Sequence, residues 1–305
     1  MPAAPPDIPF RPDRAPLVPP GGADLHATDM TATFAADLTL ADAQRQLAQI
    51  NQWLPIDGDP SWALGRLVEV NSTGPLRLGY GAWRDLLLGC QFHTARGDLI
   101  TAGGRTVKNV AGYDLTKFMV GQAGAFGKLA TITTRTYRRP EGVITAWLDP
   151  DPAYVGQLLP TALRPQYMMI SARGLACGYT GDARTLAFYR DAVRALAPRV
   201  VHERSLAEDT ATRAAAWAWG SPNSARASVP PTRIMQFIES ANWPDACADA
   251  AFGIAVGPAR DADHARLTTA ARAAGGSVYF MSADGTLAGV ETPPRVRAIL
   301  DQLKA

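Results

Sequence analysis

Residues 103–140 of the chain read GGRTVKNVAGYDLTKFMVGQAGAFGKLATITTRTYRRP and contain six glycines. Glycine lets backbone amides approach an anion or a flat ring closely, and successive amides in a turn form a nest for phosphate oxygens. The segment after the last of these glycines, residues 128–137, alternates and is rich in β-branched side chains, which is typical of a strand. The stretch therefore predicts a ligand-binding loop that leads into a strand. The alternative is that its glycines only form turns.

This loop matches neither of two common nucleotide-binding patterns. No G-x-G-x-x-G follows a predicted strand and opens a helix, so the sequence does not support a Rossmann site. The segment from Gly121 to Gly127 precedes Lys128 as in a phosphate loop, but Leu129 stands where that pattern needs serine or threonine.

Composition indicates a globular protein with few specialised features. The chain has 305 residues, of which 47% are hydrophobic and 19% are charged, enough for one large or two ordinary domains. Its net charge is +2 and its basic residues are scattered, which argues against a nucleic-acid partner. The three cysteines lie far apart and the four histidines form no paired motif, so we expect a reduced, cytoplasmic protein without a metal site. No apolar run is long enough to predict a transmembrane segment.

Hydrophobic periodicity and turn residues predict an α+β chain. Up to residue 140 we expect a strand over 30–34, a helix over 40–54, a loop over 65–81, a hairpin of 90–94 with 99–102, a helix over 115–120 and a strand over 128–137. Beyond it we expect strands over 143–148, 167–171, 200–202, 234–238, 252–256 and 277–281, and helices over 183–196, 259–274 and 294–304.

Three segments carry a family resemblance. GGRTVKNVAGYDLTKFMVGQAGAFGKLATI (103–132) resembles the late part of the FAD-binding domain of the vanillyl-alcohol-oxidase, or PCMH, type. Within that type it is most similar to the FAD-binding E subunits of bacterial glycolate oxidases, whose block KNVAGYD it contains. NSTGPLRLGYGAWRDLLLG (71–89) and QRQLAQINQWLPID (44–57) resemble the segments that precede this block. The resemblance is good over 39–140 and weaker in the remainder, where SVPPTRI (228–234) carries it.

The resemblance implies a PCMH-type α+β fold, with FAD held noncovalently between two lobes by backbone amides. It divides the chain into a flexible proline-rich arm (1–24), an FAD-binding domain with a shortened first lobe (25–140) and a smaller α+β cap domain (141–305). The positions that match cofactor contacts of the family are Gly65, Gly74, Arg84, Asp85, Lys108, Asn109, Tyr113, Asp114, Gly124, Gly127 and Leu129.

Some of these positions have alternative interpretations. Lys108 near a flavin would stabilise the anionic reduced ring, but it is equally interpreted as a solvated loop lysine. Arg84 and Asp85 are candidates for anion contact or for a surface ion pair. No catalytic residue is assigned: His202 follows a predicted strand, where a histidine is more often structural. Trp217 and Trp219 are interpreted as core or interface packing.

The sequence also departs from the family. Only PPGG (19–22) stands near the place of the usual pyrophosphate loop, and Arg66 replaces the second glycine of the T-x-GG turn. The resemblance implies an FAD-binding subunit of a glycolate-oxidase-like 2-hydroxy-acid dehydrogenase, in complex with a second flavin subunit and an iron–sulfur subunit. The departures keep a degenerate, flavin-free structural subunit open. A stand-alone FAD-dependent oxidase is a third alternative, and peripheral attachment to the inner membrane face through partners is an alternative to a purely cytoplasmic location.

Overall fold

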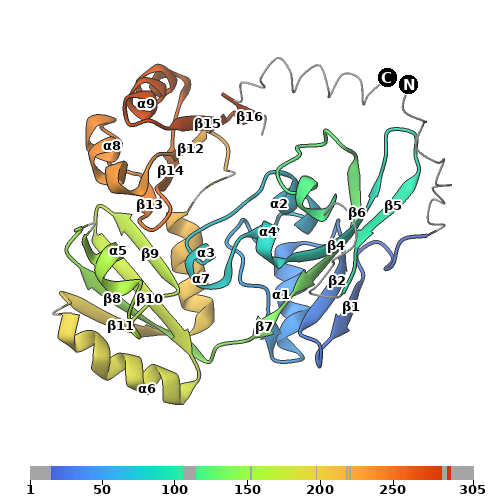
Figure 1. The fold of residues 1–305 in the computed structure, drawn as a ribbon, viewed down its shortest axis with the longest axis horizontal. Helices are drawn as coiled ribbons and strands as arrows, with labels where there is room; N and C mark the ends of the chain where they lie inside the picture. The colour runs from blue at the N-terminus through green and yellow to red at the C-terminus, as the bar shows by residue number, and fades with distance from the viewer. Residues whose placement is uncertain are drawn as a thin grey trace, which may run out of the picture.

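Two large β-sheets lie side by side and divide the protein into two halves (Figure 1). The computed structural model describes residues 15–105, 115–151, 153–196, 198–217, 219, 221–283 and 287–289. The first sheet has the order β1-β2-β6-β4-β5, and all its neighbouring strands are antiparallel. Its strands are β1 (Ala23–His26), β2 (Thr31–Ala35), β4 (Leu87–His93), β5 (Leu99–Gly103) and β6 (Lys128–Arg135). The predicted hairpin and the predicted strand over 128–137 are thereby confirmed.

Short helices pack on one face of this sheet around a shared core. They are α1 (Leu40–Ala48), α2 (Leu64–Glu69) and α4 (Trp83–Leu86). Helix α3 (Arg77–Tyr80) and the 3-10 turn η1 (Leu115–Phe118) also belong to this part of the chain. Helix α1 begins where the Thr39 side chain accepts a hydrogen bond from the Asp42 amide. Its buried residues Leu40, Ala43 and Leu47 recur at helical spacing and face the core.

Two predictions for this half are wrong in their extent. The helix expected to reach Leu54 ends at Ala48, because Asn51 is left-handed (φ 56°) and β3 (Gln52–Trp53) pairs with β7 (Tyr137–Arg138). The expected loop over 65–81 contains α2 and α3. Helix α2 forms despite Gly65 because Leu64, Leu67 and Val68 bury one apolar face in the core.

Of the predicted N-terminal arm, the described part from residue 15 lies against the sheet, where the Leu17 amide donates to Gln91 Oε1 at 2.6 Å.

The second sheet has the order β11-β8-β10-β9-β13-β14-β12-β15-β16. Its strands are β8 (Gly142–Leu148), β9 (Tyr167–Ser171), β10 (Gly174–Gly181), β11 (Val200–Arg204), β12 (Ser224–Ser228), β13 (Cys247–Asp249), β14 (Ile254–Pro258), β15 (Ser277–Met281) and β16 (Leu287–Ala288). The helices that contribute to the core on one face are α5 (Ala153–Leu158), α6 (Ala183–Ala192), α8 (Ile234–Ser240) and α9 (Asp261–Ala273). Helix α7 (Leu206–Ala216) lies on the opposite face, beside the first half.

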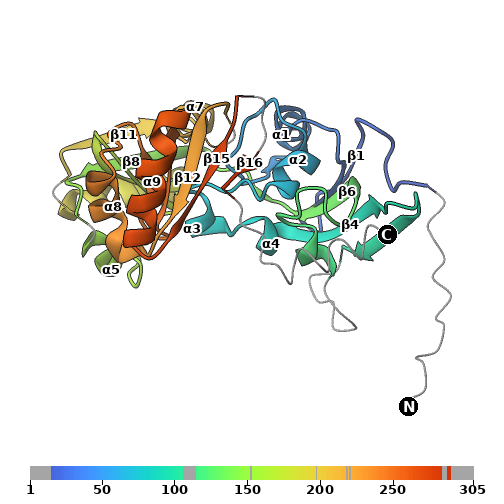
Figure 2. The same ribbon diagram turned by 90° about the horizontal axis from the view of Figure 1, so that it is seen from above.

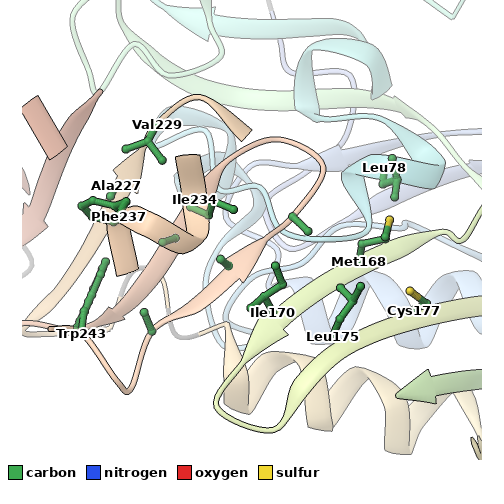
Figure 3. Packing of buried hydrophobic residues seen from close by; sticks show 14 of the residues in the cluster. Leu78, Met168, Ile170, Leu175, Cys177, Ala227, Val229, Ile234, Phe237 and Trp243 are labelled. Carbon is green, nitrogen blue, oxygen red and sulfur yellow. The ribbon is translucent and has the colours of Figure 1, made fainter. Parts of the chain in front are cut away.

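Sequence periodicity predicted several of these elements and mistook one. The strands over 167–171 and 277–281 are confirmed, and the helix over 183–196 continues from α6 through the 3-10 turn η2 (Val193–Leu196). The strand expected over 234–238 is helix α8, because Ile234 and Phe237, three residues apart, both insert into the core (Figure 3). The helix expected over 294–304 lies outside the described residues.

Helix α3 of the first half inserts into the second half. Leu78 belongs to the core of the second sheet and points toward Met168 (Figure 3). The Gly79 amide donates to the Gln166 carbonyl at 3.0 Å, and a Cβ on Gly79 would lie only 2.8–2.9 Å from Gln166. Both views place α3 at the boundary between the halves (Figures 1 and 2). The glycine is required here because the two backbones approach so closely.

A second glycine contact makes a strong prediction for stability. Gly178 of β10 pairs with Tyr167 of β9, and a Cβ on Gly178 would lie 2.0 Å from a Tyr167 ring carbon. We expect Gly178→Ala to lower the free energy of unfolding by about 2–3 kcal/mol in urea titrations, because the buried ring must leave its place. Gly156→Ala is the control, since helix α5 leaves open space around that glycine. An equal effect of Gly178→Ala in a Tyr167→Leu background would contradict the steric cause.

Candidate functional site

The structure brings together two segments that the sequence placed beside a cofactor. The Gly121 amide donates to the Val68 carbonyl at 2.9 Å, and the Ala123 amide donates to the Glu69 carbonyl at 3.0 Å. The loop after residue 120 therefore rests on the end of helix α2, although about fifty residues separate them in sequence. Gly121, Ala123 and Gly124 are all left-handed, with φ of 80°, 49° and 83°. This loop, 121–127, and the turn 71–76 after α2 form the candidate site, which we call the loop pair.

Two polar atoms of the turn have no partner within the described part of the chain. Asn71 Oδ1 and Thr73 Oγ1 are buried and make no hydrogen bond there. Buried polar atoms are normally paired, so such atoms next to a loop point to a missing ligand. An added Cβ on Gly121 would lie 3.4 Å from the Asn71 Cβ, so the loop and the turn are in contact at this point. At Gly124 a Cβ would meet nothing within 4 Å, so the backbone there is open to a ligand. These residues fit a group that offers several hydrogen bonds, as FAD does.

Gly65 and Gly74 have structural roles that need no cofactor. A Cβ on Gly65 would lie 2.9 Å from the Ala36 Cβ, and the Gly65 amide donates to the Ala36 carbonyl at 2.8 Å. A Cβ on Gly74 would lie 2.4 Å from the Asp57 Cβ. Both glycines are thus required by close packing inside the first half.

Arg84, Asp85, Gly127 and Leu129 also support the fold. Asp85 Oδ2 accepts the Ala82 amide at 2.8 Å and so caps α4, while Arg84 Nη2 donates to the Lys117 carbonyl at 3.2 Å. A Cβ on Gly127, at φ 141°, would lie 2.2 Å from the His93 carbonyl oxygen, beside an irregularity in the β4–β6 pairing. Leu129 is buried in the core of the first half. The remaining predicted positions, Lys108, Asn109, Tyr113 and Asp114, lie outside the described residues.

A groove of about 1160 Å³ runs beside the 121–127 loop. Gly124 and Gly127 line it, together with the exposed apolar side chains Leu115, Phe118 and Phe126. Phe118 and Phe126 meet edge to face, with ring centroids 6.4 Å apart. Exposed apolar side chains that gather in this way mark an interaction surface. Burial raises the pKa of Glu69, which also lines the groove.

Sequence reasoning missed a buried ionic network that joins the halves behind the turn. Arg213 of α7 is 2% exposed and pairs with Asp57 of the first half and with Asp209, whose Oδ2 lies 2.8 Å from Arg213 Nε. Tyr167 donates to Asp209 Oδ1 at 2.6 Å and lies 2.9 Å from the Thr145 hydroxyl. Burial raises the pKa of Asp209 and of Tyr167. The only signal in the sequence was the spacing of Asp209 and Arg213, one helical turn apart.

The network also holds the turn 71–76 in place. Asp57 Oδ2 accepts the Leu76 amide at 2.8 Å. On the same turn the Thr73 carbonyl accepts the indole N–H of Trp217 at 3.0 Å. Trp217 and Trp219 are 5% and 6% exposed and belong to the core between the halves, which agrees with their interpretation as packing residues. The position of Thr73 therefore depends on both halves of the protein.

The solved structures provide the comparison that identifies the fold. Alkyldihydroxyacetonephosphate synthase matches with a TM-score of 0.63 over 92% of this chain and 62% of its own, at 15% identity. The fold is the PCMH-type FAD-binding fold. The PCMH-type α+β fold that the family resemblance implied is therefore confirmed. No protein-family model matches the chain.

Curated relatives match about two fifths of the chain. Glycolate oxidase subunit GlcE of Escherichia coli (strain K12) is 32% identical over 123 residues, which cover 39% of this chain and 35% of that protein. Glycolate oxidase subunit GlcD of Bacillus subtilis (strain 168) is 32% identical over 39% of this chain and 26% of its own. A mitochondrial D-lactate dehydrogenase [cytochrome] of Arabidopsis thaliana is 27% identical over 40% of this chain and 22% of its own.

These matches support the FAD-binding PCMH-type family for this chain. The matched part spans about a third or less of each relative. Among the helices of the described part, none combines the length and apolarity needed to cross a membrane. Within the same residues, no three His, Cys, Asp or Glu side chains gather as a metal site requires.

Proposed function

We propose that the chain is the FAD-binding subunit of a glycolate-oxidase-like 2-hydroxy-acid dehydrogenase complex. The glycolate oxidase and D-lactate dehydrogenase relatives support a flavin-dependent hydroxy-acid oxidoreductase. The observation that carries the proposal is the loop pair, where Asn71 Oδ1 and Thr73 Oγ1 lie buried on the turn without a hydrogen-bond partner among the described residues and Gly124 is open. In this proposal residues 25–140 bind FAD noncovalently and 141–305 form the cap domain.

The residues of the loop pair have distinct roles in this proposal. When bound, FAD would supply the acceptor for the hydride that leaves C2 of the hydroxy acid. Asn71 Oδ1 would accept, and the Thr73 hydroxyl would donate or accept, hydrogen bonds with the polar groups of the cofactor. Gly124 leaves room for close backbone approach, and the Asp57–Arg213 network fixes the turn. The exposed apolar groove beside this loop is the surface that we assign to a partner subunit, a second flavin subunit or an iron–sulfur subunit, in the cytoplasm or at the inner membrane face.

One observation favours the second candidate, a flavin-free structural subunit of such a complex. Gly65, Gly74 and Gly127 are required by packing alone, so their presence is explained without FAD. Arg66 of α2, at the position where the family has a second glycine, lies over the Trp62 ring, with 5.4 Å between its guanidinium carbon and the ring centroid. A purely structural subunit would keep these features.

The visible absorption spectrum separates the two candidates. Purified protein that has been incubated with FAD and desalted is expected to retain flavin bands. Gly124→Val should weaken FAD binding about tenfold or more, because a side chain fills the open approach. Gly275→Val is the matched control, since that glycine has φ 78° against 83° and equally open surroundings, far from the loop pair.

Two results would reject the FAD assignment. The first is a colourless protein that remains colourless after reconstitution, which would favour the structural subunit. The second is retained flavin with equal affinity in both glycine variants, which would move the cofactor away from Gly124. Copurification with the other subunits tests the complex separately from FAD binding.

A further inference from the structure

We propose a second ligand site, around Trp147 on the second sheet, that binds a small planar organic anion. The site lies on the face of the sheet that α7 covers, and it shares no residue with the loop pair. It is independent of the proposed flavin function.

The site is a pocket of about 520 Å³ with a neighbouring hollow of about 200 Å³. Strands β8, β9 and β10 supply the floor of the pocket, and one side of α7 supplies its wall. Trp147, Arg173 and Arg204 line both hollows, so the half-buried indole stands between them. Ala176, which pairs with Trp147 across the strands, also lines the larger pocket. The larger volume lies in the range of pockets that bind small molecules.

The register of the edge strand explains why basic groups gather here. Strand β11 pairs with β8 so that Val200 lies opposite Trp147 and His202 opposite Thr145. Side chains alternate between the faces of a sheet, so His202 and Arg204 lie on the same face as Trp147. Arg173 reaches this face from the turn between β9 and β10. His202, to which the sequence assigned no catalytic role, lines the hollow beside Trp147.

The arginines around the site differ in whether an acidic side chain pairs with them. Arg213 is neutralised by Asp57 and Asp209, and Arg199 pairs with Asp149. Among the described residues, Arg173 and Arg204 make no ion pair within 4 Å. Arg204 lies near enough to Glu208 to help lower the pKa of that carboxyl, but Glu208 is held first by hydrogen bonds from Ser205.

The remaining lining carries little negative charge. Asp245, at the far rim of the larger pocket, is the one acidic residue among the side chains that line the two hollows in the described chain. Arg204 also favours the charged form of Asp209, but Asp209 is already paired with Arg213. The site therefore presents two guanidinium groups that have no ion pair within 4 Å in the described chain, beside an aromatic ring, and it attracts anions.

This combination selects the chemistry of the ligand. Guanidinium groups bind carboxylates and phosphates through paired hydrogen bonds, and an indole stacks with a flat ring. The Ser171 hydroxyl accepts from the Arg173 amide and keeps its proton for a further hydrogen bond, while Met169 and Ala176 give an apolar floor. Aromatic carboxylates and nucleotide phosphates share the required features, namely a flat ring and an anionic group.

Calorimetric titration of the full chain tests the site with four probes. The anions are 2-naphthoate and adenosine monophosphate, and their uncharged counterparts are 2-naphthamide and adenosine. We expect at least one anion to bind with a Kd of about 1 mM or tighter, and about tenfold more tightly than its uncharged counterpart. Whichever of 2-naphthoate and adenosine monophosphate binds shows whether the site takes an aromatic carboxylate or a nucleotide phosphate.

Two pairs of substitutions locate the binding. The double variant Arg173→Gln with Arg204→Gln should bind the anion about tenfold or more weakly than the native chain. The double variant Arg184→Gln with Arg194→Gln, on the other side of the sheet, should bind it with unchanged affinity. Equal binding by both double variants, or no saturable binding of either anion by the native chain, would overturn the proposal. Circular dichroism checks that the variants are folded. The flavin spectrum of the Arg173 and Arg204 variant is expected to match that of the native chain, so failure of one proposal does not imply failure of the other.

Discussion

Arg213→Leu is expected to lower the free energy of unfolding by about 3–5 kcal/mol, a large share of the stability of an ordinary domain. The substitution leaves the carboxylates of Asp57 and Asp209, 6% and 1% exposed, without their common cation. A buried unpaired charge is costly because the protein interior solvates it poorly. The loss also releases the turn 71–76, since Asp57 accepts the Leu76 amide.

Urea unfolding of native and variant protein measures this effect. Arg194→Leu is the control, because that arginine forms a surface pair with Asp191 and its side chain is 72% exposed. A surface pair of this kind contributes at most about 1 kcal/mol. Adding Asp57→Asn and Asp209→Asn to Arg213→Leu should recover part of the loss, because the buried charges are then gone. A loss that the two asparagines do not reduce would mean that packing, and not unpaired charge, is the cause.

Asp249 is expected to make the protein less stable as the pH rises from about 4 to about 7. Burial raises the pKa of this carboxyl from 3.8 to about 7, although the amides of Ala251 and Phe252, at 3.0 and 3.3 Å, oppose the shift. Its Oδ2 is buried without a hydrogen-bond partner in the described chain. The folded state then binds a proton that the unfolded state has already released, so ionisation of Asp249 lowers stability by at most about 4 kcal/mol across this window.

The surroundings of Asp249 do not remove this dependence. Arg77 of α3 favours the charged carboxylate, whereas Asp57 disfavours it. Arg226, on the same sheet face, is itself largely buried, and burial lowers the pKa of its guanidinium. Burial, with a smaller contribution from the neighbouring Asp249, raises the pKa of the Cys247 thiol to about 12. This thiol therefore carries no charge between pH 4 and 7.

Asp249→Asn tests the assignment, because the amide oxygen can still accept both backbone N–H groups while the side chain cannot ionise. Urea unfolding at several pH values should show a flatter profile between pH 4 and 7 for the variant, and little difference in slope above pH 8. Asp245→Asn, which alters an exposed carboxyl nearby, is the control. Parallel profiles for native protein and Asp249→Asn would show that another group carries the pH dependence.

Local patterns in the sequence predicted the structure of segments whose conformation depends mainly on their own residues. Hydrophobic periodicity predicted the helix that begins at Leu40, and Leu40, Ala43 and Leu47 form its buried face. Alternation and β-branched residues predicted the strand after Gly127. The motifs at 71–89 and 103–132 also predicted the PCMH-type fold, which the solved structures confirm. FAD binding, the site residues and the domain boundaries remain predictions.

Tertiary structure decided whatever depends on contacts between distant residues. Sequence spacing did not reveal that Gly65 and Gly74 are needed against Ala36 and Asp57, since a glycine that makes room for packing has the same local pattern as one that makes room for a ligand. Nor did it reveal the pairing of Arg213 with Asp57, 156 residues away. The sequence by itself determined several strands, the start of the first helix and the family likeness of this chain, because periodicity and short motifs act over a few residues. Only the fold decided which charges are buried together and which basic residues surround Trp147, because burial and charge compensation depend on neighbours from both halves.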